Sequence, residues 1–272
     1  MLENTSHTCS DPHFVTRKPE IFDIWDQMQR LQTDFAIAQE LSFYYTSAEW
    51  QSAQTVLDVG SGNGYYLEKI ASRFPEKTYH GIDLSDELVA VAEQESDGRN
   101  VSFSCRELCE LTESFDFVLM RLVLQHLDDV PTFLSEVAMV TKPGGSALII
   151  DAHDPVRFFY PEFPEFTRFF AAYSENERKA GRDRCVASRV NEALASSTAW
   201  QLGDITRLVI PSTIPGNMAL FTKTYTLLVD LVEQAGELSY DFAAVKEAWR
   251  QWSQMPGAYT QVGLNMIRVD RM

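Results

Sequence analysis

The feature that most constrains this chain is a glycine-rich segment, Leu57–Gly64, with the sequence LDVGSGNG. It includes the end of an apolar run at 55–59 that is typical of a buried strand, and helical apolar spacing begins at Tyr65. Glycines at such a junction allow a tight turn and let backbone N–H groups approach a ligand closely. The segment therefore predicts a strand, a ligand-binding turn and a helix in direct succession.

The spacing of the glycines separates two kinds of nucleotide-binding turn. A dinucleotide-binding G-x-G-x-x-G turn would place its third glycine at position 65, where this chain has Tyr65. The spacing here is G-x-G-x-G, at Gly60, Gly62 and Gly64. It argues against an NAD-dependent dehydrogenase.

Beyond this turn, strand-like and helix-like periodicities alternate along the chain. Strands are predicted at 55–59, 79–83, 101–105, 116–120, 146–151, 205–211 and 261–269. Helices are predicted near 64–73, 86–95, 131–140, 217–235 and 241–252. Repeated strand–helix units predict an α/β fold with a largely parallel sheet, which binds ligands beyond the carboxyl ends of its strands.

An acidic residue ends the second predicted strand. Asp83 follows Gly64 by nineteen residues, where a carboxylate can accept hydrogen bonds from both hydroxyls of a ribose. The alternative is an acid at the start of the next helix, but Ser85 and Asp86 already suit that position. We therefore expect Asp83 to bind a nucleoside.

Further motifs follow in the second half of the core. The strand that ends at Arg121 leads to Leu124–Leu127 (LQHL) and then to Lys142–Gly145 (KPGG). With the glycine-rich turn and Asp83, this order resembles the class I S-adenosylmethionine (SAM) dependent methyltransferases, most closely their bacterial small-molecule branch. The resemblance implies a Rossmann-like, seven-stranded, mostly parallel sheet with helices on both faces and a helical cap. It also implies that the last strand, expected at 261–268, is antiparallel and lies between the fifth and the sixth.

The resemblance also implies a set of residues that contact SAM. Glu107 would accept from the adenine amino group, and the Leu108 N–H would meet a ring nitrogen. Arg106 departs from the small residue usual before that acid, so a surface charged pair is the alternative for Arg106 and Glu107. Met120 and Arg121 would face the methionine end, where Arg121 could pair with its carboxylate. The full set is Asp58, Gly60, Gly62, Gly64, Asp83, Leu84, Glu107, Leu108, Met120 and Arg121.

The alternation of predicted strands and helices stops between residues 152 and 204. Aromatic residues recur there at helical spacing, with helix-start signals at Pro161 and Glu162: Phe159, Phe163, Phe166, Phe170 and Tyr173. This stripe is either the buried face of a helix or the lining of a substrate pocket. We expect four parts: an N-terminal helical segment at 1–50 that contributes to the cap, a SAM-binding core at 51–151, a helical cap insertion at 152–204, and the C-terminal part of the sheet at 205–272. Residues 155–185 and the helix around Phe22, Trp25 and Met28 should cover the SAM methyl group.

Methyl transfer from SAM requires a general base only if the acceptor must lose a proton. The sequence contains no recognisable catalytic motif, so the catalytic residues stay unassigned. His153, Tyr160 and Tyr173 are the candidates, with Asp151 and Asp154 nearby. For His126, packing or helix capping competes with catalysis.

Three functions remain open from the sequence. The first is methyl transfer to a small metabolite or natural-product intermediate. The second is a non-methylating reaction of SAM, such as cyclisation of its aminobutyrate arm to azetidine-2-carboxylate with release of methylthioadenosine. Aromatic residues could hold the sulfonium in that case. The third is SAM binding without catalysis.

Composition restricts the partners. The net charge of −16 opposes binding to nucleic acid. A basic run at Arg178, Lys179, Arg182, Arg184 and Arg189 is either a solvated face or a collar for an acidic small molecule.

No apolar stretch is long enough for a membrane span, and no signal peptide is evident, so we expect a cytoplasmic protein. The cysteines, Cys9, Cys105, Cys109 and Cys185, lack metal-ligand spacing; we expect buried free thiols and no metal. The sequence does not indicate the oligomeric state.

Overall fold

All seven strands expected from the sequence are present in the structure, a computed structural model that describes residues 19–184 and 186–272. They are β1 (Thr55–Val59), β2 (Thr78–Asp83), β3 (Val101–Cys105), β4 (Phe115–Arg121), β5 (Thr141–Ala152), β7 (Trp200–Pro211) and β8 (Tyr259–Arg271). The helices are α2 (Pro19–Thr46), α3 (Ala48–Ser52), α4 (Tyr65–Ala71), α5 (Asp86–Glu95), α6 (Val130–Val140), α7 (Pro164–Lys179), α8 (Val186–Ser196), α9 (Asn217–Ala235) and α10 (Phe242–Trp252). Short 3₁₀ turns are η1 (Leu108–Glu110), η2 (Leu124–His126) and η3 (Asp154–Val156).

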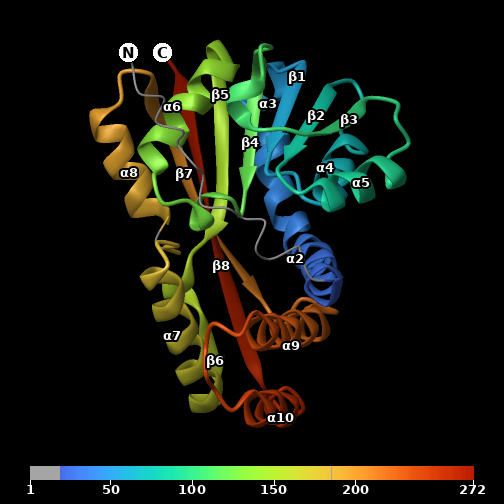
Figure 1. The fold of residues 1–272 in the computed structure, drawn as a ribbon, viewed down its shortest axis with the longest axis vertical. Coiled ribbons are helices and arrows are strands. Elements are labelled where there is room, and N and C mark those ends of the chain that lie inside the picture. The colour runs from blue at the N-terminus through green and yellow to red at the C-terminus, as the bar shows by residue number, and fades with distance from the viewer. Residues whose placement is uncertain (1–18, 185) are drawn as a thin grey trace, which may run out of the picture.

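The sheet has the order β3-β2-β1-β4-β5-β8-β6, with β7 paired to β8 (Figure 1). Strands β1 to β5 pair in parallel, and β8 is antiparallel to β5 and to β7. The mostly parallel α/β fold and the antiparallel last strand are therefore confirmed. The expected strand count was one too low, because β6 (Phe158–Tyr160) pairs with the lower end of β8. That pairing holds Phe159 in a strand, so α7 begins at Pro164 rather than at Pro161.

Apolar residues alternate between the two faces of the parallel strands. Val56 and Leu119 belong to one buried cluster, and their neighbours Leu57 and Val118 belong to another on the opposite face. Both faces are covered by helices, which is why these strands read as nearly continuous apolar runs. Sheets of this kind bind ligands at the carboxyl ends of their parallel strands, so we expect a ligand at that edge.

A layer of helices lies beyond the carboxyl ends of the parallel strands (Figure 1). It contains α7, α9, α10 and the first half of α2, held by aromatic packing such as Phe166 with Tyr225 at 4.9 Å and Tyr225 with Trp249 at 4.7 Å between ring centroids. We had expected 205–272 to belong to the sheet, but α9 and α10 pack in this layer because their apolar faces meet α2 and α7. Conversely, α8 lies within the expected cap insertion, yet Val186 and Val190 pack with α6 against the sheet.

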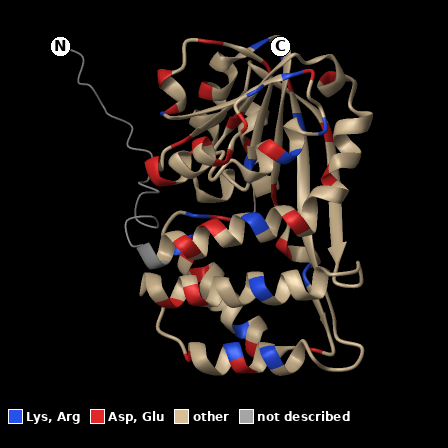
Figure 2. Ribbon diagram, turned by 90° about the vertical axis from the view of Figure 1, so that its right-hand side faces the viewer, with Lys and Arg blue, Asp and Glu red and all other residues tan. Residues whose placement is uncertain are grey.

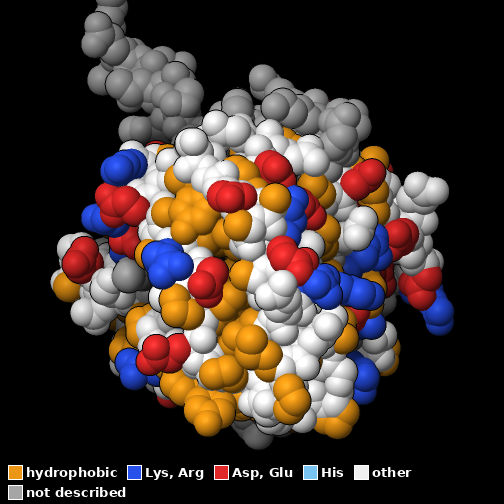
Figure 3. All heavy atoms as spheres, turned by 90° about the horizontal axis from the view of Figure 1, so that it is seen from below, with side chains coloured by type: hydrophobic (Ala, Val, Ile, Leu, Met, Phe, Trp, Pro, Cys, Tyr) orange, Lys and Arg blue, Asp and Glu red, His pale blue; other side chains and the backbone are white. Residues whose placement is uncertain are grey.

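Acidic and basic residues are mixed along the helices. Figure 2 shows Asp and Glu positions interspersed with Lys and Arg positions along the helices below the sheet. Seen from below, the lower end of the molecule also exposes hydrophobic side chains between the charged ones (Figure 3). In the part of the chain that the structure describes, no helix is long and apolar enough to cross a bilayer.

The expectation of buried thiols is wrong for the cysteines that can be tested. Cys105 and Cys109 are free and exposed. They lie at the end of β3 and in η1, and β3 is the edge strand of the sheet, so no further strand from residues 19–184 or 186–272 covers them. Cys9 and Cys185 lie outside the described residues.

Candidate functional site

The glycine-rich turn adopts the backbone that its glycines predict. Gly60, Gly62 and Gly64 have φ values of 75°, 56° and 73°, a region that side chains with a Cβ rarely adopt. The N–H groups of Gly60 and Ser61 donate to the Ile82 carbonyl at 2.8 and 2.9 Å, which ties the turn to the end of β2. The turn therefore lies at the carboxyl edge of the sheet, beside the residue that follows Ile82.

That residue, Asp83, connects the turn to the next helix. One carboxylate oxygen accepts the Gly62 N–H at 2.8 Å, and the other accepts the Ser85 N–H at 2.9 Å. Ser85 in turn caps α5 by accepting from the Leu88 N–H at 3.2 Å. The position of the Asp83 carboxylate is thus set by β2 and by two backbone N–H groups.

The hydroxyl of Ser61 offers a test of whether a polar ligand fits this turn. Within the described residues, Ser61 Oγ is buried and has no hydrogen-bond partner. A buried hydroxyl without a partner costs free energy, which a ligand with hydrogen-bonding groups would recover. The residues around the turn therefore suit a nucleoside such as the adenosyl part of SAM.

Helix α2 covers the turn directly. Gln29 Oε1 accepts the Asn63 N–H at 3.0 Å, and Asn63 Nδ2 donates to Asp26 Oδ1 at 2.6 Å. The Gln29 side chain also occupies the space where a Cβ on Gly62 would lie. The helix expected to contribute to the cap therefore lies against the turn, although the sequence did not identify Gln29 or Asp26.

The end of β3 meets the same edge. The Arg106 N–H donates to the Asp83 carbonyl at 3.1 Å, which brings the following Glu107 near the turn. Glu107 is exposed, and its N–H donates to Glu110 Oε2 at 3.0 Å, while Leu108 is buried in the cluster that contains Val59 and Ile82. Leu84, partly buried, follows Asp83 directly. The structure thus groups these predicted residues, and their contacts with adenine stay a prediction.

A buried polar cluster lies on the α2 side of the sheet. Arg121 pairs with Glu40 of α2 at 3.1 Å, with side chains 8% and 0% exposed, and its guanidinium lies 4.5 Å from the ring centre of Tyr66. Burial raises the pKa of the nearby Asp58 to about 8, an effect that Arg121 opposes and Asp83 reinforces. Met120 is buried in the cluster on the opposite face.

Arg121 makes a second contact that the sequence did not indicate. Two of its nitrogens donate to Glu40, and its pairing with the SAM carboxylate stays a prediction. A fully buried Glu40 requires a counter-charge from within the protein. Arg121 therefore holds α2 to β4 in this structure.

A second polar network lies below β4 and β5. Arg184 donates to Asp154 Oδ2 and to Gln125 Oε1, each at 2.7 Å. Asp151, at the end of β5, accepts from the N–H groups of Ala152 and Gln125 at 2.8 and 3.2 Å. Burial raises the pKa of Asp151 to about 6, against these backbone bonds and the charge of Arg184. Gln125 and Arg157, which also joins this network, were not predicted as site residues.

The three candidate catalytic residues are placed differently. Tyr160 is 63% exposed on β6, where it pairs with Tyr259, so it does not line an enclosed pocket. Tyr173 on α7 is partly buried, and burial and the charge of Glu177 raise its pKa to about 12. His153 follows β5, and burial and Arg207 lower its pKa, which favours the neutral imidazole that a general base needs. His153 and Tyr173 stay candidates.

His126 is partly buried with its ring edge-on to Trp25 at 5.9 Å between centroids. Burial, with the charges of Arg184 and Arg182, lowers its pKa to about 4.

We expect the unfolded chain to protonate His126 near pH 6.5 and the folded protein only near pH 4. The free energy of unfolding should therefore fall as the pH is lowered through this window, and less so for His126→Gln. Urea titrations of both proteins at pH 7 and pH 5 test this; an equal loss in both would contradict it.

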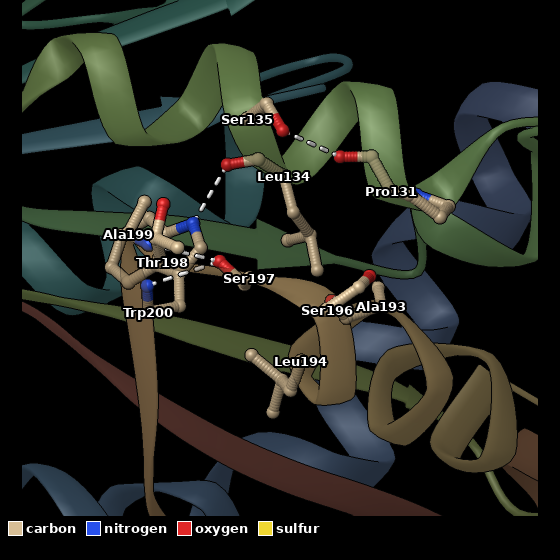
Figure 4. Close-up of a pocket in the computed structure, with 10 residues that line it drawn as sticks. All are labelled: Pro131, Leu134, Ser135, Ala193, Leu194, Ser196, Ser197, Thr198, Ala199 and Trp200. Atoms are coloured by element: carbon tan, nitrogen blue, oxygen red, sulfur yellow. Dashed lines mark hydrogen bonds between the residues drawn. The ribbon is translucent and has the colours of Figure 1, made fainter.

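The cavity drawn in Figure 4 is not this site. It holds about 170 Å³ between α6, the end of α8 and the start of β7, where Trp200 Nε1 donates to the Leu134 carbonyl at 2.7 Å. Because β7 runs parallel to β5, its first residue lies at the opposite edge of the sheet from the glycine-rich turn. Among the described residues, no group of three His, Cys, Asp or Glu side chains is arranged to hold a metal.

Comparison with known proteins decides the family of this core. A family described as "Methyltransferase domain" matches residues 57–149, which span the turn, Asp83, Glu107 and Arg121. The chain contains a class I SAM-dependent methyltransferase domain. Domains of this family use SAM as their cosubstrate.

Relatives of this methyltransferase domain share its core and differ in length. Phosphoethanolamine N-methyltransferase 2 of Caenorhabditis elegans is 34% identical over 108 residues, which cover 37% of this chain and 24% of the relative. The uncharacterized methyltransferase YcgJ of Bacillus subtilis is 31% identical over 135 residues, 47% of this chain and 53% of the relative. The matched region thus spans about half or less of these relatives. The crystal structure of the plantazolicin methyltransferase BpumL with a triazolic desmethylPZN analogue and S-adenosylhomocysteine (SAH) has a TM-score of 0.52 at 17% identity. The match covers 93% of this chain and 92% of that chain, and it shows the shared fold.

Proposed function

We propose that this protein transfers a methyl group from SAM to a small-molecule acceptor, a metabolite or natural-product intermediate. The observation that carries the proposal is Asp83, which bridges Gly62 and Ser85 at the carboxyl edge of the sheet, inside the matched methyltransferase region. A carboxylate held in this way can accept the two ribose hydroxyls. SAM, when bound, supplies an electrophilic methyl group on a sulfonium.

The protein's own part is to bind, orient and exclude water. The turn and Asp83 would hold the adenosyl part, with Glu107 and Leu108 at the adenine. Helix α2 covers the turn through Gln29 and Asp26, and α7 and α9 lie in the helical layer below the sheet (Figure 1). Enclosure matters because methyl transfer gains from alignment of donor and acceptor and from removal of water.

The experiment incubates the protein with SAM alone and with a fractionated metabolite extract, and identifies the SAM-derived product by mass spectrometry. S-adenosylhomocysteine formed only with extract supports methyl transfer. Methylthioadenosine formed without acceptor would show that the protein consumes SAM itself, as in cyclisation of its aminobutyrate arm. SAM binding without any product would show a binding protein. Each of the last two results would overturn the proposal.

Tyr173 tests the role of α7 in this site. If its ring and hydroxyl contact the acceptor, Tyr173→Ala should lower turnover by about tenfold, the scale of one lost hydrogen bond, while affinity for SAH stays unchanged. Tyr160→Ala is the matched control, because Tyr160 is an exposed tyrosine of the same segment. Turnover and calorimetric SAH affinity should be measured on both variants. Normal turnover of folded Tyr173→Ala, with a lower melting temperature, would assign Tyr173 to packing alone.

A further inference from the structure

Two buried side chains below the sheet have polar atoms without partners. Arg157 joins η3 to β6, and its side chain is 12% exposed; Tyr225 lies on α9 and is 5% exposed. Within the described residues, Arg157 Nε, Arg157 Nη1 and Tyr225 Oη are buried and make no hydrogen bond of standard geometry, and the neighbouring Arg157 guanidinium opposes the burial that raises the pKa of Tyr225. Buried donors without acceptors cost free energy. An acceptor group brought by a ligand would remove that cost.

Two arginines and two aspartates form the charged network around Arg157, so their formal charges balance. Asp154 accepts from Arg157 Nη2 at 2.7 Å and from Arg184 Nε at 2.7 Å. Asp151, farther along the network, supplies the second negative charge near Arg184, and neutral backbone N–H groups bind it. The guanidinium of Arg157 also lies 3.4 Å from the ring centre of Phe170, which presents an apolar face beside the charge. The two unpaired nitrogens of Arg157 therefore suit a carboxylate attached to an apolar or aromatic group.

The position of Arg157 and Tyr225 relates these two residues to the proposed methyl-transfer site. The Leu122 N–H donates to the Ile150 carbonyl at 2.7 Å, which holds the segment after β4 beside the end of β5. Gln125, Asp154 and Arg184 form a hydrogen-bonded network below these two strand ends, and Arg157 continues it. The glycine-rich turn follows β1, on the other side of β4. The pair thus lies toward the acceptor side rather than the adenosyl side.

We propose that Arg157 and Tyr225 bind a carboxylate of the acceptor substrate, with Phe170 against the adjoining part of that molecule. This rests on the proposed methyl transfer and specifies its substrate class: acceptors with a single carboxylate rather than a phosphate dianion. The same chemistry could come from the aminobutyrate carboxylate of SAM. The acceptor is the source we assign, because β4 separates the pair from the glycine-rich turn.

Small probes test the carboxylate site without knowledge of the acceptor. Binding of benzoate, benzamide and phenylphosphonate to the full chain saturated with SAH should be measured by saturation-transfer NMR. Benzoate should bind most tightly. Arg157→Gln should weaken benzoate by at least about tenfold, the scale of a hydrogen bond to a charged group, and Tyr225→Phe should weaken it several-fold. Arg168→Gln, an exposed arginine on the neighbouring α7, is the control and should leave benzoate binding unchanged.

Tyr225→Phe keeps the test valid if Arg157→Gln does not fold, because it removes a single hydroxyl and keeps the ring that packs in the core. Equal binding of benzamide, tighter binding of phenylphosphonate, or benzoate binding unaffected by Tyr225→Phe would overturn the assignment. SAH affinity, measured by calorimetry on the same proteins, should not change. A loss of SAH affinity in Arg157→Gln with unchanged benzoate binding would assign the site to SAM instead. Failure of the wild type to bind SAH would refute the proposed function, whatever benzoate does.

Discussion

Replacing Asp83 by alanine should weaken SAH binding by about 1.5–3 kcal/mol, the range for hydrogen bonds to a charged partner, or roughly ten- to more than a hundredfold in affinity. The carboxylate is placed at the edge of the sheet by its bonds to the Gly62 and Ser85 N–H groups. A ribose at this edge would lose both of its hydroxyl acceptors in the alanine variant. Isothermal titration calorimetry with SAH measures the effect directly.

Two further variants show whether the carboxylate itself is responsible. Asp83→Asn keeps one oxygen acceptor and should lose less affinity than Asp83→Ala. Asp86→Ala removes an exposed acid from the start of α5 and should leave affinity unchanged. If Asp83→Ala, folded to the same extent as the wild type, binds SAH with wild-type affinity, Asp83 has no role at the ribose.

Breaking the buried ion pair should have the largest effect on stability. Glu40→Ala leaves the Arg121 guanidinium buried without its carboxylate and should lower the free energy of unfolding by about 3–5 kcal/mol. The double variant Glu40→Leu with Arg121→Met removes both charges and should be less destabilised than the single variant. Urea unfolding followed by tryptophan fluorescence measures all three proteins, since Trp50 is buried in the same core.

A surface ion pair provides the comparison. Arg99 and Asp97 are paired at 2.8 Å but exposed, and Asp97→Ala should cost less than about 1 kcal/mol. The account of the Arg121 pair is contradicted if Glu40→Ala is no more destabilising than Asp97→Ala, or if the double variant loses as much stability as the single one.

The parts of the site that depend on neighbouring residues in the chain could be predicted from the sequence. The strand, the turn at Gly60–Gly64 and the position of Asp83 follow from local periodicity and from the backbone freedom of glycine. The strand order, with β8 between β5 and β7, followed from the resemblance to a family. No comparable signal specified β6, whose length of three residues is too short for a period to be recognised.

The residues that the sequence could not identify act through long-range contacts. Gln29 meets Asn63, and Glu40 meets Arg121, pairs separated by 34 and 81 positions. An apolar stripe on a helix predicts a buried face but not the partner that buries it. The helices predicted at 217–235 and 241–252 were therefore grouped with the C-terminal part of the core rather than with the helical layer. Arg184 was noted within a basic run, but its contacts with Asp154 and Gln125 required the fold.

The central claim is that SAM binds at the carboxyl edge of the sheet, beside the glycine-rich turn and Asp83. A crystal structure of the protein with SAH tests it most directly. The account predicts the ribose hydroxyls within hydrogen-bond distance of the Asp83 carboxylate and the adenine within reach of Glu107 or the Leu108 N–H. An SAH molecule whose adenosyl group lies more than about 5 Å from Asp83, Glu107 and Leu108, beyond direct hydrogen bonding, would contradict it.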